Sequence, residues 1–219
     1  MSRLQELIAE LCPDGVEYKA LGEVGIFLRG SSFQKKHFVE DGTPCIHYGQ
    51  EHTRFNIATN EVISYLDNDF AAKMKRAKPG DLIIATTAED DNAVGKAIAW
   101  IGDTDVVVSN DAYIYRHELE PKYMAYLFAS DLFQEPKRQY ITGTKVRRLN
   151  DKSMSKIVIP VPPIEVQREV VRILDEYTRP TRDSLADPDA TAPLRLLEIA
   201  HPELDPATGR AVSQSLGVY

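Results

Sequence analysis

Cysteine is nearly absent from this 219-residue sequence, which contains only Cys12 and Cys45. Two cysteines cannot form the network of disulfides that holds small secreted domains together, so the sequence predicts a reduced, cytoplasmic protein. Long apolar runs are absent as well, since none approaches the ~18 residues that span a bilayer. Residues 1–6 also lack the basic and then apolar order of a signal peptide. We therefore expect no membrane partner.

Basic residues are in deficit, with 26 Lys and Arg against 33 Asp and Glu and a net charge of −7. This balance excludes a uniformly basic coat for nucleic acid but allows a local basic face. The deficit is uneven, because residues 161–219 hold 6 basic and 10 acidic side chains. Hydrophobic residues make up 43% of the chain, which is enough to form a core and argues against disorder throughout.

Motifs for catalysis and for cofactor binding are also missing. There is no glycine-rich phosphate loop ending in Lys-Ser/Thr and no G-x-G-x-x-G after a strand. Asp14, Glu17 and Lys19 have the letters of a nuclease metal site but crowd one turn, whereas such groups converge on one cation from adjacent strands. We therefore expect no catalytic residues and no cofactor.

Two further groups of polar residues are weak candidates for a metal site. Cys45 and His47 share one face of a strand, with His37 and His52 nearby, but no CxxC partner completes a tetrahedral set. Histidines on the surface or in hydrogen bonds are the favoured interpretation. Residues 89–91 (Glu-Asp-Asp) could bind a divalent ion or accept hydrogen bonds from cytosine amino groups, but a solvated loop is favoured. We expect no metal ion.

Hydrophobic patterning predicts an α+β fold. Short apolar runs near glycines predict three strands, at residues 82–85, 96–101 and 105–108. Helical spacing near the amino terminus gives a stripe that we expect to pack on the chain's own core: Leu4, Leu7, Ile8 and Leu11. A second helix is predicted over residues 121–133, beginning at a proline. Strands and helices without βαβ alternation indicate a mixed, strand-rich domain with a few helices.

An apolar strand that runs into a proline cluster, at residues 157–163, marks a domain boundary. Pro163 suits the start of a helix, which is predicted over residues 164–177. Its apolar stripe consists of Val166, Val170, Ile173, Leu174 and Tyr177. The chain beyond is acidic and rich in turns, so we predict a divergent, disordered or loosely attached tail. The predicted divisions are a domain over 1–160, a helix within 161–178 and the tail over 179–219.

Basic side chains gather in three segments despite the acidic total. The densest, residues 137–156, contains seven Lys and Arg and a single acid. Arginine grips guanine, lysine and threonine hold phosphate oxygens, and glycine lets the backbone approach, so this mixture suits DNA. A solvated charged face is the alternative. The candidate DNA-binding residues are Arg29, Lys35, Lys36, Lys73, Lys75, Arg76, Thr142, Gly143, Thr144, Lys145, Arg147 and Arg148.

Several segments resemble the DNA-specificity (S) subunits of type I restriction–modification systems. Residues 143–149 (GTKVRRL) and then 157–175 (IVIPVPPIEVQREVVRILD) resemble the end of a target recognition domain in that family, where an IPxPPxxxQ strand exit leads into a long helix. Residues 7–17, 46–50 and 78–87 are similar to further S-subunit segments, in the family's order. The resemblance covers about residues 4–178.

The resemblance implies a non-catalytic domain that binds half of a bipartite double-stranded DNA sequence. It also implies protein partners: methyltransferase (M) subunits that methylate adenine, and a translocating restriction (R) subunit. The stripe from Val166 to Tyr177 lies on the helix that docks such partners. Typical S subunits have two recognition domains and two long spacer helices, whereas this chain has room for one domain and a short remnant of the helix. We therefore expect a half-length subunit, truncated, frameshifted, rearranged or taken as one domain, that could pair with a second S half-subunit.

Two other functions remain open at the level of sequence. The chain could be a fragment of a nuclease or methyltransferase with its own active site, although the missing motifs speak against this. It could instead be a relic that contacts only the M subunit and no longer binds DNA. Metal-dependent DNA cleavage would support the first alternative, and binding to the M subunit without binding to DNA would support the second.

Overall fold

The computed structural model describes residues 2–177, apart from the side chains of residues 51–53. Two compact units make up this range. The flanking unit contains residues 2–18 and 160–177, and the central unit contains residues 19–159. The tail predicted over residues 179–219 lies outside the described residues.

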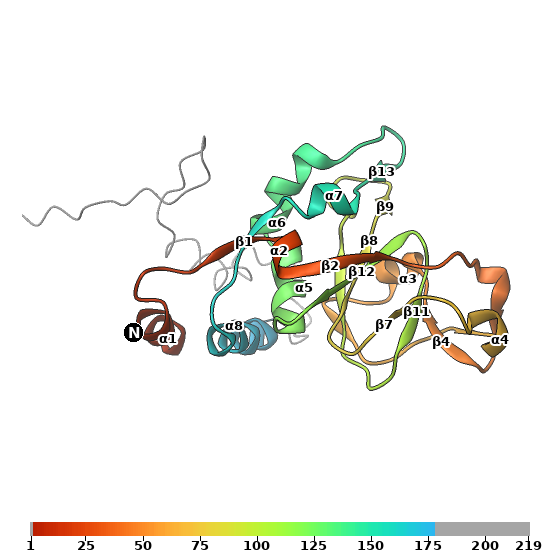
Figure 1. Ribbon diagram of the computed structural model, residues 1–219, viewed down its shortest axis with the longest axis horizontal. Coiled ribbons are helices and arrows are strands. Elements are labelled where there is room, and N and C mark those ends of the chain that lie inside the picture. The colour runs from red at the N-terminus through yellow and green to blue at the C-terminus, as the bar shows by residue number, and fades with distance from the viewer. Residues whose placement is uncertain (1, 178–219) are drawn as a thin grey trace, which may run out of the picture. The chain divides into compact units, whose positions relative to one another are not determined.

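Two five-stranded sheets form most of the central unit (Figure 1). The first has the order β2 (Gly25–Arg29), β12 (Ala112–His117), β8 (Leu82–Ala85), β10 (Ala97–Trp100) and β5 (Ala58–Thr59). The second has the order β3 (Phe38–Val39), β6 (Tyr65–Leu66), β4 (Thr43–Ile46), β11 (Val106–Val108) and β7 (Arg76–Ala77). Each sheet contains one parallel pair, β10 with β5 and β11 with β4, among antiparallel ones. The predicted α+β class is confirmed.

The main core of the central unit is built from side chains of both sheets. Val106 and Val108 of β11 belong to the same buried cluster as Ile83 of β8 and Ile98 of β10. Val107, on the other face of β11, belongs to a second cluster with Cys45, Leu66 and their neighbours. Because both faces of β11 are covered, every position in it is apolar, which is why it reads as a continuous run instead of an alternating pattern.

A pair of helices lies beside the first sheet. In place of the single helix predicted over residues 121–133, there are two, α5 (Pro121–Ala129) and α6 (Asp131–Lys137). Ser130 separates them with an extended backbone, and its hydroxyl donates to the Leu127 carbonyl at 2.7 Å. Helix α5 packs against β8 and β10, so the alternate side chains of those strands that face away from the main core are buried as well.

Short elements complete the central unit and its ends. They are β1 (Tyr18–Ala20), α2 (Leu21–Val24), η1 (Lys35–His37), α3 (Tyr48–Thr53), α4 (Asn68–Ala71), β9 (Thr87–Ala88), η2 (Arg138–Tyr140), β13 (Arg147–Arg148), α7 (Asp151–Met154) and β14 (Val158–Pro160). Four of these short strands form two separate two-stranded sheets, one of β1 with β14 and one of β13 with β9. The second of these positions the site described below.

The flanking unit consists mainly of α1 (Arg3–Leu11) and α8 (Ile164–Tyr177), which contact each other. The Ser2 hydroxyl accepts from the Gln5 amide at 3.3 Å, and the Gln5 side chain accepts from the Ser2 amide at 2.9 Å, which completes a capping box. Leu4 and Leu7 of the predicted stripe are buried, whereas Ile8 is half-buried and Leu11 is 37% exposed, so the stripe packs on the protein only in part. None of the helices in the described part of the chain is long and apolar enough to cross a membrane.

Candidate nucleic-acid interface

Residues 142–148, here called the basic loop, form a tight turn at one extremity of the central unit. The backbones of Thr142 and Arg148 exchange two hydrogen bonds, at 3.0 and 2.8 Å, which close the turn. Gly143 has φ +90°, and a Cβ at this position would lie 2.1 Å from the Val146 carbonyl oxygen, so glycine is required. The side chains of Thr144 and Lys145 are exposed at the tip.

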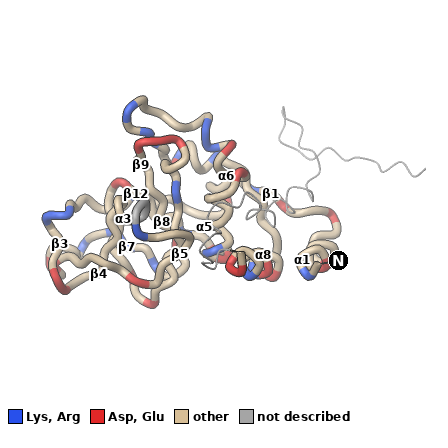
Figure 2. Tube along the Cα trace, turned by 180° about the vertical axis from the view of Figure 1, so that it is seen from behind, with Lys and Arg blue, Asp and Glu red and all other residues tan. Residues whose placement is uncertain are grey.

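The basic loop lies beside an acidic segment, residues 89–91, because β13 pairs antiparallel with β9 (Figure 2). Arg147 is held within this pairing: its Nε lies 2.7 Å from Asp91 Oδ1, an ion pair without hydrogen-bond alignment, and its Nη1 donates to the Gly143 carbonyl at 2.6 Å. The side chains of Lys145 and Arg148 make no ion pair or hydrogen bond to any described residue. Two of the three cations in this loop are therefore available to a ligand.

A close approach of two backbones brings Arg29 and Lys75 toward residues 109–111. A Cβ on Gly30 would lie 2.1 Å from the Ser109 carbonyl oxygen, so only glycine permits this approach. Arg29 Nε donates to the Asn110 carbonyl at 3.1 Å. The Ser31 amide donates to the Val108 carbonyl at 2.8 Å, and the Ser31 hydroxyl accepts from the Lys75 amide at 2.8 Å.

A hollow of about 260 Å³, here called the central hollow, joins these segments. It is lined by Arg29, Thr86, Thr87, Asp111, Tyr113, Thr142, Arg148, Leu149 and Asn150. All of these residues belong to the central unit. Candidate residues that are more than 110 positions apart in the sequence thus line one surface depression.

Several polar groups of the central hollow are already engaged within the protein. Thr86 Oγ1 donates to the Asp111 carbonyl at 2.9 Å, and the Asn150 side chain accepts from the Ser153 amide at 2.9 Å as the cap of α7. The Tyr113 hydroxyl donates to Asp151 Oδ1 at 3.3 Å. Burial, with a further contribution from Asp151, raises the pKa of Tyr113, so its hydroxyl stays protonated.

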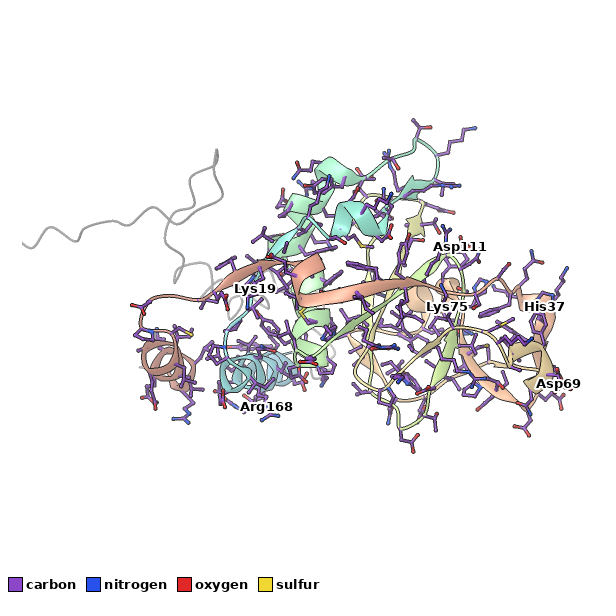
Figure 3. The ribbon with its side chains drawn as sticks, viewed as in Figure 1. Lys19, His37, Asp69, Lys75, Asp111 and Arg168 are labelled. Carbon is purple, nitrogen blue, oxygen red and sulfur yellow. The ribbon has the colours of Figure 1, made fainter. Side chains whose placement is uncertain are left out.

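The other predicted cations lie away from the basic loop. Lys35 and Lys36 are exposed in η1, just before β3 (Figure 2). The neighbouring His37 ring lies against the Phe70 ring, tilted by 52° with centroids 4.8 Å apart. Figure 3 shows Asp111 and Lys75 toward the middle of the central unit and His37 farther out. Lys73 and Lys75 are exposed, whereas the half-buried Arg76 donates from Nη2 to the Ala71 carbonyl at 3.3 Å.

Lys137, which opens the densest basic segment of the sequence, does not contribute to a basic surface. It is only 1% exposed. Its Nζ donates to the carbonyls of Val94 at 2.8 Å and Asn92 at 3.4 Å and to the side-chain oxygen of Gln134. Burial lowers the pKa of Lys137 to about 8. This lysine ties α6 to the loop that follows the acidic segment, a role that the sequence pattern does not reveal.

The metal-site candidates Cys45 and His47 are engaged within the folded protein, one buried and one capping a helix. Cys45 is fully buried, which raises the pKa of its thiol to about 12. The His47 side chain caps α3 by accepting from the Gly49 amide at 3.3 Å, and its pKa is lowered by burial and by Lys35, against an opposing effect of Asp111. Among the side chains that the structure describes, no group of three or more His, Cys, Asp or Glu residues is arranged to hold a metal ion, and the candidate His52 lies outside those side chains.

The apolar stripe of α8 is mostly covered by the protein itself. Val166, Val170 and Leu174 are at most 1% exposed. Ile173 is half-buried, and Tyr177 is 57% exposed. Of the five residues proposed to bind a partner, only these last two present accessible apolar surface in this structure.

Comparison with known proteins identifies relatives of this architecture. The family model described as the type I restriction modification DNA specificity domain matches residues 13–186. The HsdS subunit from Thermoanaerobacter tengcongensis has 21% sequence identity and a TM-score of 0.55, over 90% of this chain and 48% of that one. A chain from a structural study of complex assembly and conformational transition of the type I R-M system has 20% identity and a TM-score of 0.57, over 90% and 47%.

These two structures share the fold, and the present chain spans about half the length of each. A comparison with curated proteins finds no match. The family match covers most of the sequence and includes the basic loop and the central hollow. The chain belongs to the type I restriction modification DNA specificity domain family.

Proposed function

We propose that this chain recognises one half of a bipartite double-stranded DNA sequence as the specificity component of a type I restriction–modification complex. The observation that carries the proposal is the central hollow, where cations from separate segments meet on a chain whose net charge is −7. Arg29 and Arg148 line this hollow. The Lys75 amide donates to the hydroxyl of Ser31, which follows Arg29 by two residues in the chain. Such local positive charge within an acidic protein supports a polyanionic ligand.

The cations have two roles in this proposal. Exposed lysines on long flexible side chains suit phosphate oxygens, and they set the position of the domain on the duplex. This role falls to Lys145 on the basic loop and to Lys35, Lys36, Lys73 and Lys75. The central hollow, with arginine, threonine and carboxylate groups, suits the donors and acceptors of base edges.

The proposal extends to the protein partners of the complex. We propose that residues 1–160 form the recognition domain and that residues 161–178 begin the spacer helix. The helix would direct M subunits, and through them adenine methylation, as well as the R subunit, to the bound site. Ile173 and Tyr177 are the accessible apolar residues of α8, so they are the proposed contacts to an M subunit or to a second S half-subunit.

Binding of the purified full chain to duplex DNA tests the central proposal. Fluorescence anisotropy with a labelled duplex pool should show binding that weakens steeply between ~50 and ~200 mM salt, because phosphate contacts release counterions. Replacing Lys145, Arg147 and Arg148 together by alanine should abolish binding. The control is Lys156→Ala, which removes one exposed cation next to Ser155. The Ser155 side chain lies against Gly22 in α2, the short helix before β2.

The outcomes separate the proposal from its alternatives. Unchanged affinity in the triple variant with a retained thermal transition would reject this location of the interface. DNA cleavage by the purified chain in the presence of Mg²⁺ would favour the nuclease alternative. Capture of an M subunit by a chain that binds no duplex would favour a relic limited to protein contacts.

A further inference from the structure

The central hollow contains a carboxylate that phosphate binding does not explain. Asp111 lines the hollow together with Arg29 and Arg148. The Asp111 backbone is engaged, because its carbonyl accepts from both the amide and the hydroxyl of Thr86 at 2.9 Å. Its carboxylate makes no hydrogen bond or ion pair with any of the side chains or backbone groups that the structure describes.

A carboxylate at this position opposes a purely electrostatic role for the surface. Negative charge repels the phosphates that the neighbouring cations attract, so Asp111 lowers non-specific affinity. A carboxylate can accept hydrogen bonds but cannot donate them. In the grooves of DNA, the groups that it can bind are therefore the amino groups of bases.

Arg29 supplies the complementary half of this arrangement. Its Nε donates a hydrogen bond to the carbonyl of Asn110 at 3.1 Å, and Asn110 directly precedes Asp111 in the chain. The other guanidinium N–H groups make no hydrogen bond to a described residue, and no ion pair joins Arg29 to Asp111. The central hollow is thus lined by the remaining guanidinium donors of Arg29 and by the acceptor-only carboxylate of Asp111, and neither group has a hydrogen-bond or ion-pair partner among the described residues.

We propose that the central hollow reads a cytosine–guanine pair, with Asp111 accepting from the cytosine N4 amino group and Arg29 donating to O6 and N7 of the paired guanine. The major-groove edge of this pair presents the amino donor on one base and two acceptors together on the other, which matches a carboxylate and a guanidinium fork that line one hollow. An adenine–thymine pair divides its two acceptors between the bases, on either side of the amino group, so the fork cannot engage both in the same way. This inference rests on the proposed function.

Selection from duplexes with a randomised segment tests the inference on the full chain. The unaltered protein should select a motif that contains a C·G pair. Asp111→Asn should reduce the preference for that pair about tenfold, because an amide donates as well as accepts and no longer excludes base acceptors. Affinity for duplexes that lack the pair should rise, since a charge that repels phosphate is gone. Arg29→Lys, which keeps the charge but loses the fork, should weaken the preference at the same pair.

The control removes the same charge elsewhere in the central unit. Asp103 is exposed in the segment between β10 and β11, at the opposite end of β11 from the central hollow. Asp103→Asn should leave the selected motif intact. The Asp111 substitution should preserve the fold, because the hydrogen bonds of this residue to Thr86 use its backbone carbonyl. A thermal transition measured for each variant verifies this.

Three results would overturn the inference while leaving the proposed function in place. They are an unchanged motif with Asp111→Asn, a loss of preference at an A·T pair instead, and effects of Asp111→Asn and Arg29→Lys at different pairs. A failure of the unaltered chain to prefer any sequence would instead overturn the proposed function, and this inference with it.

Discussion

Lys137 and Lys145 belong to the same basic stretch of sequence but to physically different regions. At the end of α6, Lys137 is 1% exposed and its ammonium group is surrounded by carbonyl and amide oxygens of the protein. At the tip of the basic loop, Lys145 is exposed and its side chain makes no hydrogen bond to a described residue. The first lysine holds two segments of the protein together, while the second is available to a ligand.

The difference shows that a basic cluster in a sequence is not yet a basic surface. Arg116 belongs to the first kind, since it pairs with Asp81 at 2.7 Å, and Arg147 is intermediate, since it pairs with Asp91 but borders the basic loop. Substitutions of engaged cations and of their partners should therefore change the free energy of unfolding. Substitutions of unpaired cations should change DNA affinity and its salt dependence.

The largest effect is expected at the Arg116–Asp81 pair. Asp81 is 3% exposed, and its carboxylate accepts from Arg116 Nε and Nη2 and from the Lys78 amide at 2.8 Å. Asp81→Ala leaves these donors without their acceptor, so the free energy of unfolding should fall by about 3 kcal/mol. Urea denaturation measures the fall, and Asp103→Ala serves as the control. A loss below about 1 kcal/mol would contradict the assigned structural role.

Lys137 should show the next largest effect. Lys137→Met keeps most of the apolar side chain but removes the donor to the carbonyls of Val94 and Asn92. Because acceptors without donors remain in a buried place, the free energy of unfolding should fall by about 2 kcal/mol. The matched change Lys156→Met, at an exposed site, should cost much less. If Lys137→Met instead weakened DNA binding at unchanged stability, the contrast with Lys145 would be wrong.

His117 extends the comparison to acid conditions. Both of its ring nitrogens are shielded from solvent, and burial lowers its pKa from 6.5 to about 4, against an opposing effect of Asp81. The unfolded chain therefore binds a proton first, so stability is lost as the pH falls from 6.5 toward 4. At pH 5.5 the loss should be about 1.4 kcal/mol relative to pH 7.5. Denaturation at both pH values should show a smaller difference for His117→Gln than for the unaltered chain or His37→Gln.

Sequence patterns located the elements in which the pattern of burial stays the same from one end to the other. The strand at residues 82–85 and the helix at 164–177 have the predicted bounds, because a doubly buried strand and an amphipathic helix each carry a distinct apolar pattern. The interruption at Ser130 was not predicted, since the apolar residues on both sides of it fit one stripe. Strand β12 was also missed, although it is the neighbour of both β2 and β8 in the first sheet.

The candidate site was predictable only in part, for a related reason. Local sequence identified the basic loop and Arg29 as candidates, but their meeting depends on the approach of Gly30 to Ser109 and on the pairing of β9 with β13. Those contacts join residues distant in sequence, so no local pattern encodes them. The same limitation hid Asp111 in the central hollow and the burial of Lys137.

The smallest effect is expected at Lys145, and it tests most directly the contrast between this exposed lysine and the buried Lys137. Lys145→Ala removes one exposed cation with no partner among the described residues, so stability should change by less than about 0.5 kcal/mol. If Lys145 contacts one phosphate, the slope of log affinity against log salt should become shallower by about 0.9. Anisotropy titrations at several salt concentrations measure this slope, with Lys156→Ala as the control of equal charge. An identical slope in both variants would show that Lys145 is solvated instead of bound to DNA, because only a cation that displaces counterions from the duplex alters the salt dependence.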